Sequence, residues 1–220
     1  MSDETTAPRF SESARAEMLH RRTLVLDGIL DDDNGTLLMT QLAQLAADDP
    51  DSDVSLWIHS PGGSVPAMLA LRDLMRTVPC PVSTLVLGMA CSAGQFLLSA
   101  GTPGRRRALP HAKVLMHQGS SGIGGTAADV ELQAEDLRAT RDTVLEAIAR
   151  DTGQSVETVR ADSQRDTWFT AEQARAYGFV DEVAADFAVL APQARRRPIG
   201  LTSTVLDAAD HGTGSAGGAR

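Results

Sequence analysis

Short apolar runs alternate with amphipathic segments along this chain, and that alternation constrains its fold more than any other feature. The runs typical of buried strands lie at residues 23–26, 54–58, 82–87 and 113–116. Between the first three of them, apolar residues recur at helical spacing, from a cap at Asp33 or Asn34 to about Asp48 and again to about Thr77. Strands that alternate with helices predict βαβ crossovers and a largely parallel sheet covered by helices, an α/β fold.

The longest predicted helix runs from about Thr126 to Arg150. One of its faces is charged, and the other carries an apolar stripe of Val130, Ala134, Leu137, Val144 and Ile148. At the usual rise per residue this helix is roughly 37 Å long, so we expect it to protrude from the globule. A single apolar stripe requires a partner, either the core of the same chain or another subunit. Shorter helices are expected over 155–162 and from a cap at Thr170 to Gly178.

The chain is expected to form one folded domain with a segment at each end. Residues 1–18 are predicted to be a flexible N-terminal segment and residues 19–187 the folded domain. Residues 188–220 are rich in Ala, Gly, Thr and Arg without periodicity, which predicts a disordered tail.

Composition excludes several classes of partner and site. The formal net charge of −9 argues against nucleic acid or an anionic membrane as a main partner. No apolar run approaches the roughly 20 residues that span a bilayer, and the N-terminus lacks the pattern of a secretory signal, so a cytoplasmic location is expected. The two cysteines, Cys80 and Cys91, have no metal-ligand spacing and are expected to be reduced.

Ser92 lies between the strand pattern at 82–87 and an apolar helix pattern at 95–100. The small residues around it predict a tight turn that places the hydroxyl at a helix N-terminus, where free N–H groups favour developing negative charge. Such a strand-to-helix turn is typical of a nucleophile elbow, although the Gly-x-Ser-x-Gly pattern is absent. Two other interpretations stay open: a serine that merely packs at the turn, and a nucleophilic role for the adjacent Cys91, which is otherwise a small apolar core residue.

Three further features bear on Ser92. His117 ends a predicted strand and therefore lies at the carboxyl edge of the sheet, where ligand crevices form. Gly62 and Gly63 offer backbone N–H groups suited to an oxyanion hole. Asp166 lies beside Trp168 and Phe169, which could shield it, and a shielded carboxylate can orient an imidazole. Taken singly, each of these features also fits a surface histidine, an ordinary turn or a solvated loop carboxylate.

Taken together, the motifs resemble the proteolytic subunit of the Clp ATP-dependent protease (the ClpP family) over about residues 19–185. The motifs are SPGG at 60–63, GMACSAGQFLL at 88–98, LP at 109–110 with MHQ at 116–118, GIGGTAADVE at 122–131, DTGQ at 151–154 and RDTWFTAE at 165–172.

The resemblance implies a crotonase-like ClpP fold in which residues 126–150 form the handle helix. It implies a serine endopeptidase with Ser92 as nucleophile, His117 as general base and acid, and Asp166 as the partner that orients His117. By position in the motifs, the amides of Gly63 and Ala93 would form the oxyanion hole, and Gly62, Gly124 and Gly125 would bind the substrate strand.

The resemblance also implies how the subunit would work in an assembly. Two stacked heptameric rings would enclose the active sites, and an unfoldase ATPase would thread unfolded proteins into the chamber. ATP is then used by the partner ATPase, and this chain needs no cofactor and no metal.

The chain departs from the family pattern at several positions. The N-terminal segment differs, Gly119 replaces the proline that usually follows His-Gln, and Ala93 replaces the usual methionine after the serine. At the surface that receives the ATPase, Trp57 keeps an aromatic residue, but Thr77 and Arg107 replace aromatic residues. Gln164 replaces an acidic residue that usually helps to lock the rings. These changes predict a divergent paralogue that works in a mixed ring with a second subunit of the same type.

Two alternative functions remain at this point. The chain could be a weakly active or structural ring subunit that regulates a mixed Clp complex. It could also be a crotonase relative that binds acyl-CoA, although Ser64 and Val65 stand where that function needs acidic residues after the Gly-Gly turn.

Overall fold

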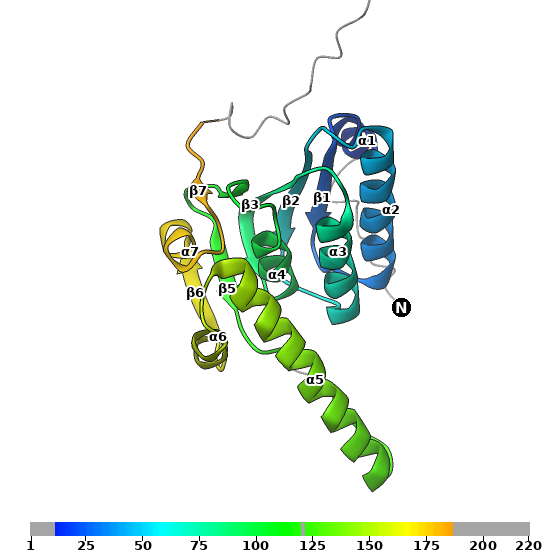
Figure 1. The fold of residues 1–220 in the computed structure, drawn as a ribbon, viewed down its shortest axis with the longest axis vertical. Coiled ribbons are helices and arrows are strands. Elements are labelled where there is room, and N and C mark those ends of the chain that lie inside the picture. Colours follow the sequence, from blue (N-terminus) through cyan, green and yellow to red (C-terminus); the bar gives the residue numbers. More distant parts are fainter. Residues whose placement is uncertain (1–11, 120–121, 187–220) are drawn as a thin grey trace, which may run out of the picture.

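A seven-stranded sheet forms the centre of the molecule, as a computed structural model that describes residues 12–119 and 122–186 shows (Figure 1). Its strands are β1 (Thr23–Asp27), β2 (Val54–Ser60), β3 (Val82–Cys91), β4 (Arg106–Ala108), β5 (Lys113–Met116), β6 (Thr167–Thr170) and β7 (Glu182–Val183). The main path is β1-β2-β3-β4-β7, and β5 joins β3 to β6. All pairs are parallel except β5–β6, which confirms the predicted α/β fold with a largely parallel sheet.

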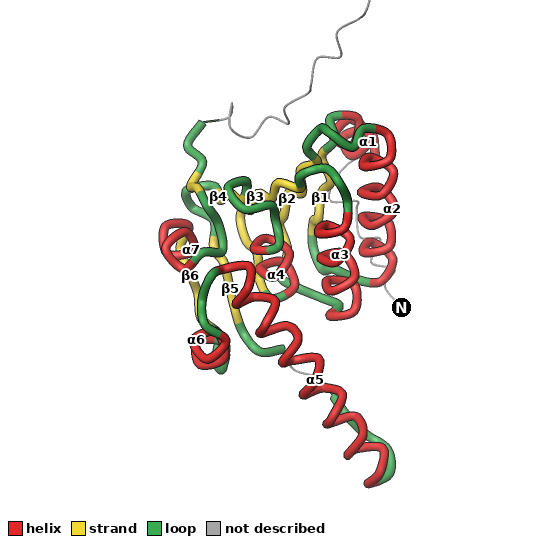
Figure 2. The backbone as a smooth tube through the Cα atoms, in the orientation of Figure 1, coloured by secondary structure: helices red, strands yellow, loops and turns green. Residues whose placement is uncertain are grey.

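Seven helices accompany the sheet in the part of the chain that the structure describes (Figure 2). They are α1 (Glu12–His20), α2 (Asp32–Asp48), α3 (Val65–Thr77), α4 (Ala93–Ser99), α5 (Ala127–Thr152), α6 (Val156–Asp162) and α7 (Ala171–Tyr177). Helices α2, α3 and α4 lie side by side against the sheet (Figure 1). Their apolar faces and the strands together bury a core that includes Leu42, Leu56, Leu71, Phe96 and Leu97.

The long strand β3 creates the branch that positions the site. Its first half pairs with β4, through Thr84–Arg106 to Val86–Ala108. Its second half pairs with β5, through Met89–Lys113 to Cys91–Leu115. The carboxyl ends of β3 and β5 therefore meet at one edge of the sheet, as expected for the crevice of an open α/β sheet.

The predicted long helix is confirmed as α5, which extends from the body of the molecule (Figures 1 and 2). Thr126 caps it with a capping box closed by Asp129, and Gly153 ends it in the left-handed conformation. The C-terminal part is buried at Leu145 and Ile148, whereas Leu132 nearer the tip is 67% exposed. The chain's own core therefore covers the root of the apolar stripe at Ile148, whereas Val130, Ala134 and Leu137 in its outer part are only half-buried in this single chain.

A buried ion-pair cluster fastens the root of α5 to α3. Arg72 donates to both carboxylate oxygens of Asp151, at 2.9 and 3.0 Å, and Arg76 donates to the same carboxylate at 2.6 Å. The side chains of Arg72 and Asp151 are 8% and 1% exposed. The guanidinium of Arg72 also lies 5.8 Å from the ring centre of Phe96 on α4. Because a buried charge is costly without its partner, this cluster fixes the three helices relative to one another.

Several boundaries differ from those expected. The N-cap of α2 is Asp31, and Asn34 closes its capping box, so neither Asp33 nor Asn34 is the cap itself. Strands β4, β6 and β7 were not predicted, because each has four residues or fewer and no extended apolar run. Residues 1–11 of the predicted flexible segment 1–18 lie outside the described residues. The rest of that segment belongs to α1, and Leu19 of this helix packs against the core. The predicted tail 188–220, like residue 187, lies outside the described residues.

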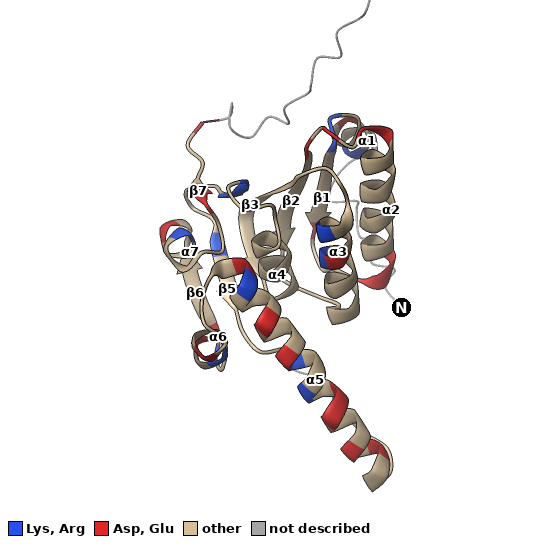
Figure 3. Cartoon of the chain, in the orientation of Figure 1, with Lys and Arg blue, Asp and Glu red and all other residues tan. Residues whose placement is uncertain are grey.

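The arginine run at 105–107 is paired with acidic residues. Arg105 pairs with Asp53, Arg106 with both oxygens of Asp181, and Arg107 with Glu182 at 3.1 Å. Figure 3 shows that both acidic and basic residues lie along α5, with acidic residues toward its projecting end. Over residues 12–119 and 122–186, no helix is long and apolar enough to cross a membrane. The same residues include no group of three or more His, Cys, Asp and Glu side chains placed to hold a metal ion.

Candidate active site

Ser92 forms the junction between β3 and α4 in a strained backbone conformation. The predicted strand extends further than expected, through Cys91, so the turn consists of Ser92 alone. Its φ and ψ are 53° and −114°, the values of the first central residue of a type II′ turn, where glycine is preferred. Its amide donates to the Leu115 carbonyl at 3.0 Å, and its side chain does not cap α4. The hydroxyl is therefore held at the sheet edge without being used by the helix, as in a nucleophile elbow.

Gly62 packs directly against Ser92. A Cβ atom at Gly62 would lie 2.9 Å from the Ser92 Cβ and 3.4 Å from its Oγ, and the φ of Gly62 is +119°. Only glycine satisfies both the close approach and this backbone angle. The Ser-Pro-Gly-Gly turn thus forms one wall beside the serine hydroxyl.

Two backbone N–H groups in this region are not used by the local secondary structure. Leu30 forms a parallel bridge with Gly63 by donating to the Gly62 carbonyl and accepting from the Ser64 amide, both at 2.8 Å. That bridge leaves the amide of Gly63 itself unused. Ala93 is the first residue of α4, so its N–H has no acceptor within the helix. These are the two amides predicted from the sequence, one on each side of Ser92 along the chain.

His117 and Asp166 face each other across the antiparallel pair β5–β6. The register pairs Met116 with Thr167, and one step further along both strands places His117 opposite Asp166. The His117 Nδ1 lies 3.4 Å from the Asp166 Oδ1. With Nδ1 on the carboxylate, the other ring nitrogen, Nε2, is the one left to act on Ser92.

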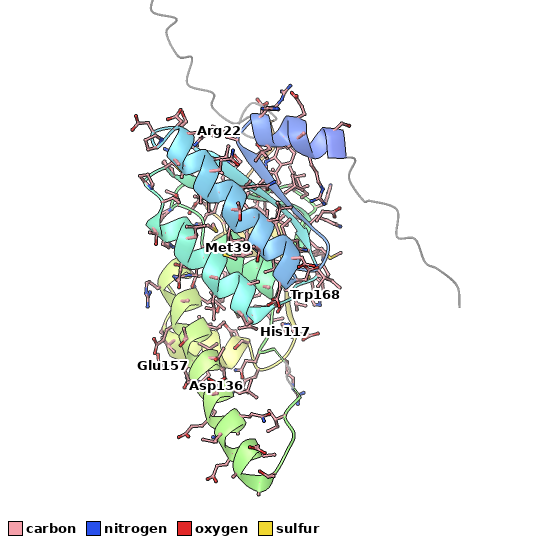
Figure 4. The ribbon with its side chains drawn as sticks, turned by 90° about the vertical axis from the view of Figure 1, so that its right-hand side faces the viewer. Arg22, Met39, His117, Asp136, Glu157 and Trp168 are labelled. Carbon is pink, nitrogen blue, oxygen red and sulfur yellow. The ribbon has the colours of Figure 1, made fainter. Side chains whose placement is uncertain are left out.

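Of the two interpretations of Asp166, a shielded and a solvated carboxylate, the single chain shows the solvated one. The Asp166 side chain is 68% exposed, and Trp168 is 52% exposed. The reason is topological: within the described residues β6 pairs only with β5, so its outer edge is uncovered. His117 and Trp168 lie on the same side of the molecule in Figure 4.

Gln118 anchors the residue that follows the histidine, a feature that the sequence analysis did not assign. Its amide donates to the Ser163 carbonyl at 2.7 Å, and its side chain donates to the Ser163 hydroxyl at 3.2 Å and the Arg160 carbonyl at 3.3 Å. These bonds tie the end of β5 to the end of α6 and so limit how His117 can move. Gly119, which replaces the family proline, begins the loop after this anchor and has open space around it.

Ser92 and His117 line one cavity of about 290 Å³ between α3, α4 and α5. Its apolar wall comprises Val65, Met68, Phe96, Leu137, Val144, Leu145 and Ile148. The remaining lining residues are Gln95, Gln118, Gly119, Arg138, Thr140, Arg141 and Ser163. A cavity of this kind beside a serine hydroxyl accepts an apolar side chain of a bound substrate.

Gly124 and Gly125 are not brought to this cavity. They precede Thr126, the cap at the projecting end of α5, whereas the cavity touches α5 only from Leu137 onward, roughly 18 Å along the helix from Gly125. The side chain of Gln133 also occupies both backbone groups of Gly124, at 3.3 and 3.0 Å. In this conformation, a substrate strand reaches these glycines only if it runs along α5 and displaces Gln133.

Cys91 does not compete for the role of nucleophile. Its side chain lies in the buried end of β3, and burial, together with the negative charge of Asp166, raises the pKa of its thiol. A thiol with a raised pKa carries little thiolate at neutral pH and is a poor nucleophile. The apolar core role considered for Cys91 is the one the structure supports.

Comparison with known proteins places this geometry in a family. The family model described as Clp protease matches residues 8–186. The ATP-dependent Clp protease proteolytic subunit 3 of Streptomyces coelicolor is 49% identical over 198 residues, which cover 90% of this chain and 91% of that protein. Subunit 1 of Corynebacterium jeikeium is 50% identical, with 83% of this chain and 96% of that protein covered. Subunit 2 of Rhodococcus jostii is 49% identical, with 84% of this chain and 95% of that protein covered. By its sequence, and with the fold that the resemblance predicted, this chain belongs to the Clp protease family of serine peptidases.

Proposed function

We propose that this Clp-family serine endopeptidase cleaves unfolded polypeptides with Ser92 as nucleophile, His117 as general base and acid, and Asp166 as the residue that orients His117. One observation carries the assignment. The strained Ser92, whose hydroxyl the helix leaves unused, lines the same cavity as His117, and His117 directs its Nδ1 toward Asp166.

The reaction follows from the positions of these groups. The Ser92 Oγ attacks the peptide carbonyl carbon while His117 Nε2 takes its proton. The tetrahedral oxyanion accepts hydrogen bonds from the amides of Gly63 and Ala93, which are fixed in place before the substrate arrives. His117 then donates the proton to the leaving amine, the peptide bond breaks, and the acyl group stays on Ser92 until water, activated by the same imidazole, releases it.

The cavity supports a preference for an apolar side chain on the residue that supplies the attacked carbonyl. Its wall beside Ser92 is apolar on three helices, at Met68 of α3, Phe96 of α4 and Leu145 of α5. Filling it with a side chain such as Leu, Met or Phe removes apolar surface from water and fixes the carbonyl over Ser92. The chain is thus suited to cleave after medium-sized apolar residues.

Clp ATPases and a second proteolytic subunit are the partners that we infer for this chain. Three relatives are named as ATP-dependent Clp protease proteolytic subunits, and their numbers 3, 1 and 2 denote several such subunits. Within the chain, the half-buried Trp57 and Arg107 lie on one face of the sheet with Leu85 between them, by the register of β2, β3 and β4. Glu182 pairs with Arg107, so this expected ATPase surface is more polar than an aromatic one. Docking would then depend on the second subunit type of a mixed, two-ring assembly.

Labelling by a fluorophosphonate tests the catalytic assignment. The reagent reacts with an activated serine hydroxyl, so the wild-type chain, assembled with its partner subunit, is expected to be labelled at Ser92. The Ser92→Ala and His117→Ala variants are expected to remain unlabelled. Labelling that persists in Ser92→Ala would contradict the assignment, and an unlabelled wild-type chain in an assembled complex would favour a structural subunit.

A further inference from the structure

We propose that Arg138 makes the cavity beside Ser92 select substrates that carry an acidic side chain two residues before the residue that supplies the attacked carbonyl. This inference rests on the proposed function, since it concerns the substrate of the same site. It adds an electrostatic preference to the apolar preference argued above.

The charges around the cavity have one sign. Among its lining residues, the side chains that can carry a charge are His117, Arg138 and Arg141, and none is acidic. The charge of Arg141 is balanced locally, because Arg141 donates to the Asp142 Oδ1 at 2.9 and 2.8 Å. The charge of His117 is faced by Asp166.

Arg138 differs from these two residues. Over the described part of the chain, no carboxylate oxygen lies within ion-pair distance of its guanidinium, although Arg138 lines the cavity. The nearby Asp142 carboxylate, one helical turn away, already accepts from Arg141 and from Arg160 at 3.1 Å. Arg138 is therefore an uncompensated cation at a substrate cavity, with donors in a planar fork that matches a carboxylate.

The position of Arg138 along α5 indicates which substrate residue it meets. Leu145 and Ile148 form the apolar end of the cavity on this helix, and Arg138 lies seven residues before Leu145, roughly 10 Å nearer the projecting end. In an extended peptide, residues two apart point to the same face and lie roughly 7 Å apart. When one side chain fills the apolar end, the side chain two residues earlier faces the Arg138 end, and a glutamate spans the remaining distance.

The test compares three fluorogenic peptides, acyl-X-Gly-Leu-fluorophore with X as Glu, Gln or Lys. The enzyme is the full chain assembled with a conventional Clp proteolytic subunit from the same source, whose own nucleophilic serine is replaced by alanine. We expect kcat/KM for the Glu peptide to exceed that for the Gln peptide about two- to fivefold, with the Lys peptide lowest. Added salt should reduce this ratio, since it screens an exposed ion pair.

Two variants and one control test whether Arg138 causes the preference for glutamate. In Arg138→Gln the Glu and Gln peptides are expected to be cleaved equally, and in Arg138→Glu the Lys peptide should become the preferred one. Arg150→Gln changes an exposed arginine on the same helix outside this cavity and should leave the preference unchanged.

The outcomes distinguish the role of Arg138 from the proposed function. Equal cleavage of the three peptides by the wild-type chain, or a glutamate preference that survives in Arg138→Gln, would overturn the role of Arg138 and leave the proposed function standing. If no peptide is cleaved and Ser92 is not labelled, the proposed function fails and this inference fails with it.

Discussion

His117 and Asp166 face each other one step beyond Met116 and Thr167, the last paired residues of β5 and β6, with 3.4 Å between Nδ1 and Oδ1. The relation depends on the strand register, because a slip by one residue would turn Asp166 to the other face of β6. Asp166 is nevertheless exposed, so the pair has no shield within the described part of this chain. Both partners are therefore placed by the sheet, while the distance between them is longer than a strong hydrogen bond.

Replacing Asp166 by asparagine should lower kcat about 10²- to 10⁴-fold with a smaller change in KM. The amide keeps the shape of the side chain but cannot stabilise the imidazolium or favour the required tautomer. Peptide hydrolysis by the assembled complex measures the effect. Glu172→Gln, which changes an exposed carboxylate on α7, is the matched control and should leave kcat unchanged. An Asp166→Asn enzyme with full kcat would show that this carboxylate does not orient His117.

Gly62→Ala should lower kcat at least tenfold while the protein stays folded. The new Cβ would lie 2.9 Å from the Ser92 Cβ, so the serine must shift, and misplacement by a fraction of an ångström is costly in rate. Activity is read together with circular dichroism, which separates a misplaced serine from a misfolded chain. Gly122→Ala, with open space around the new methyl group, should be as active as the wild type. Full activity in Gly62→Ala would mean that the turn does not confine Ser92.

Asp151→Asn should lower the free energy of unfolding by about 3–5 kcal/mol, because it leaves Arg72 without its buried carboxylate partner. The double variant Arg72→Met with Asp151→Leu should be less destabilised than Asp151→Asn, since it removes both charges. Urea unfolding at one fixed protein concentration measures both. Asp73→Asn removes a 78% exposed partner of Arg72 and should change stability by less than about 1 kcal/mol. Equal stability of Asp151→Asn and the wild type would contradict the anchoring role of this cluster.

Stability should fall in acid through Asp181. Burial alone would raise the pKa of this carboxyl, but hydrogen bonds from the side chain and backbone of Arg106 outweigh burial and lower the pKa below its ordinary value of 3.8. A lowered pKa in the folded state stabilises the fold above pH 3.8, and this contribution is lost as the pH falls through the folded-state pKa. Asp181→Asn should therefore be less stable than the wild type at pH 6, and the difference should shrink below pH 3.8. A difference in unfolding free energy that stays constant from pH 6 to pH 2 would contradict this linkage.

Removal of divalent metals should leave peptide hydrolysis unchanged, because the proposed mechanism uses a serine, a histidine and backbone amides alone. Cleavage of short peptides is measured with and without a chelator, and in the absence of ATP. A loss of activity that added metal restores would show that a metal takes part.

The strands and helices with strong periodicity could be predicted from the sequence. Strand β5 coincides with the expected 113–116, and α7 lies between the predicted cap Thr170 and Gly178. In each case local signals agree with the tertiary fold: an apolar run, a capping residue or a terminal glycine. The same agreement explains why α5 was predicted within two residues at its C-terminal end.

The parts of the site that could not be predicted depend on contacts far apart in the sequence. The register that brings Asp166 opposite His117 belongs to β6, a four-residue strand without an apolar run. The exposure of Asp166 follows from the open edge of that strand and not from its aromatic neighbours. The anchoring of Gln118 on Ser163 joins residues 45 positions apart, and no local pattern marks it.

The decisive experiment for the role of Ser92 is cleavage of an unstructured fluorogenic peptide, with Ser92→Ala in parallel. The wild-type chain is measured alone and assembled with a conventional Clp proteolytic subunit whose own nucleophilic serine is replaced by alanine. We expect hydrolysis by the assembled wild-type chain that Ser92→Ala abolishes, with Ser99→Ala, a buried serine of the adjoining helix, as the variant that retains activity. Equal hydrolysis by the wild type and the Ser92→Ala variant in the assembled complex would contradict a catalytic Ser92.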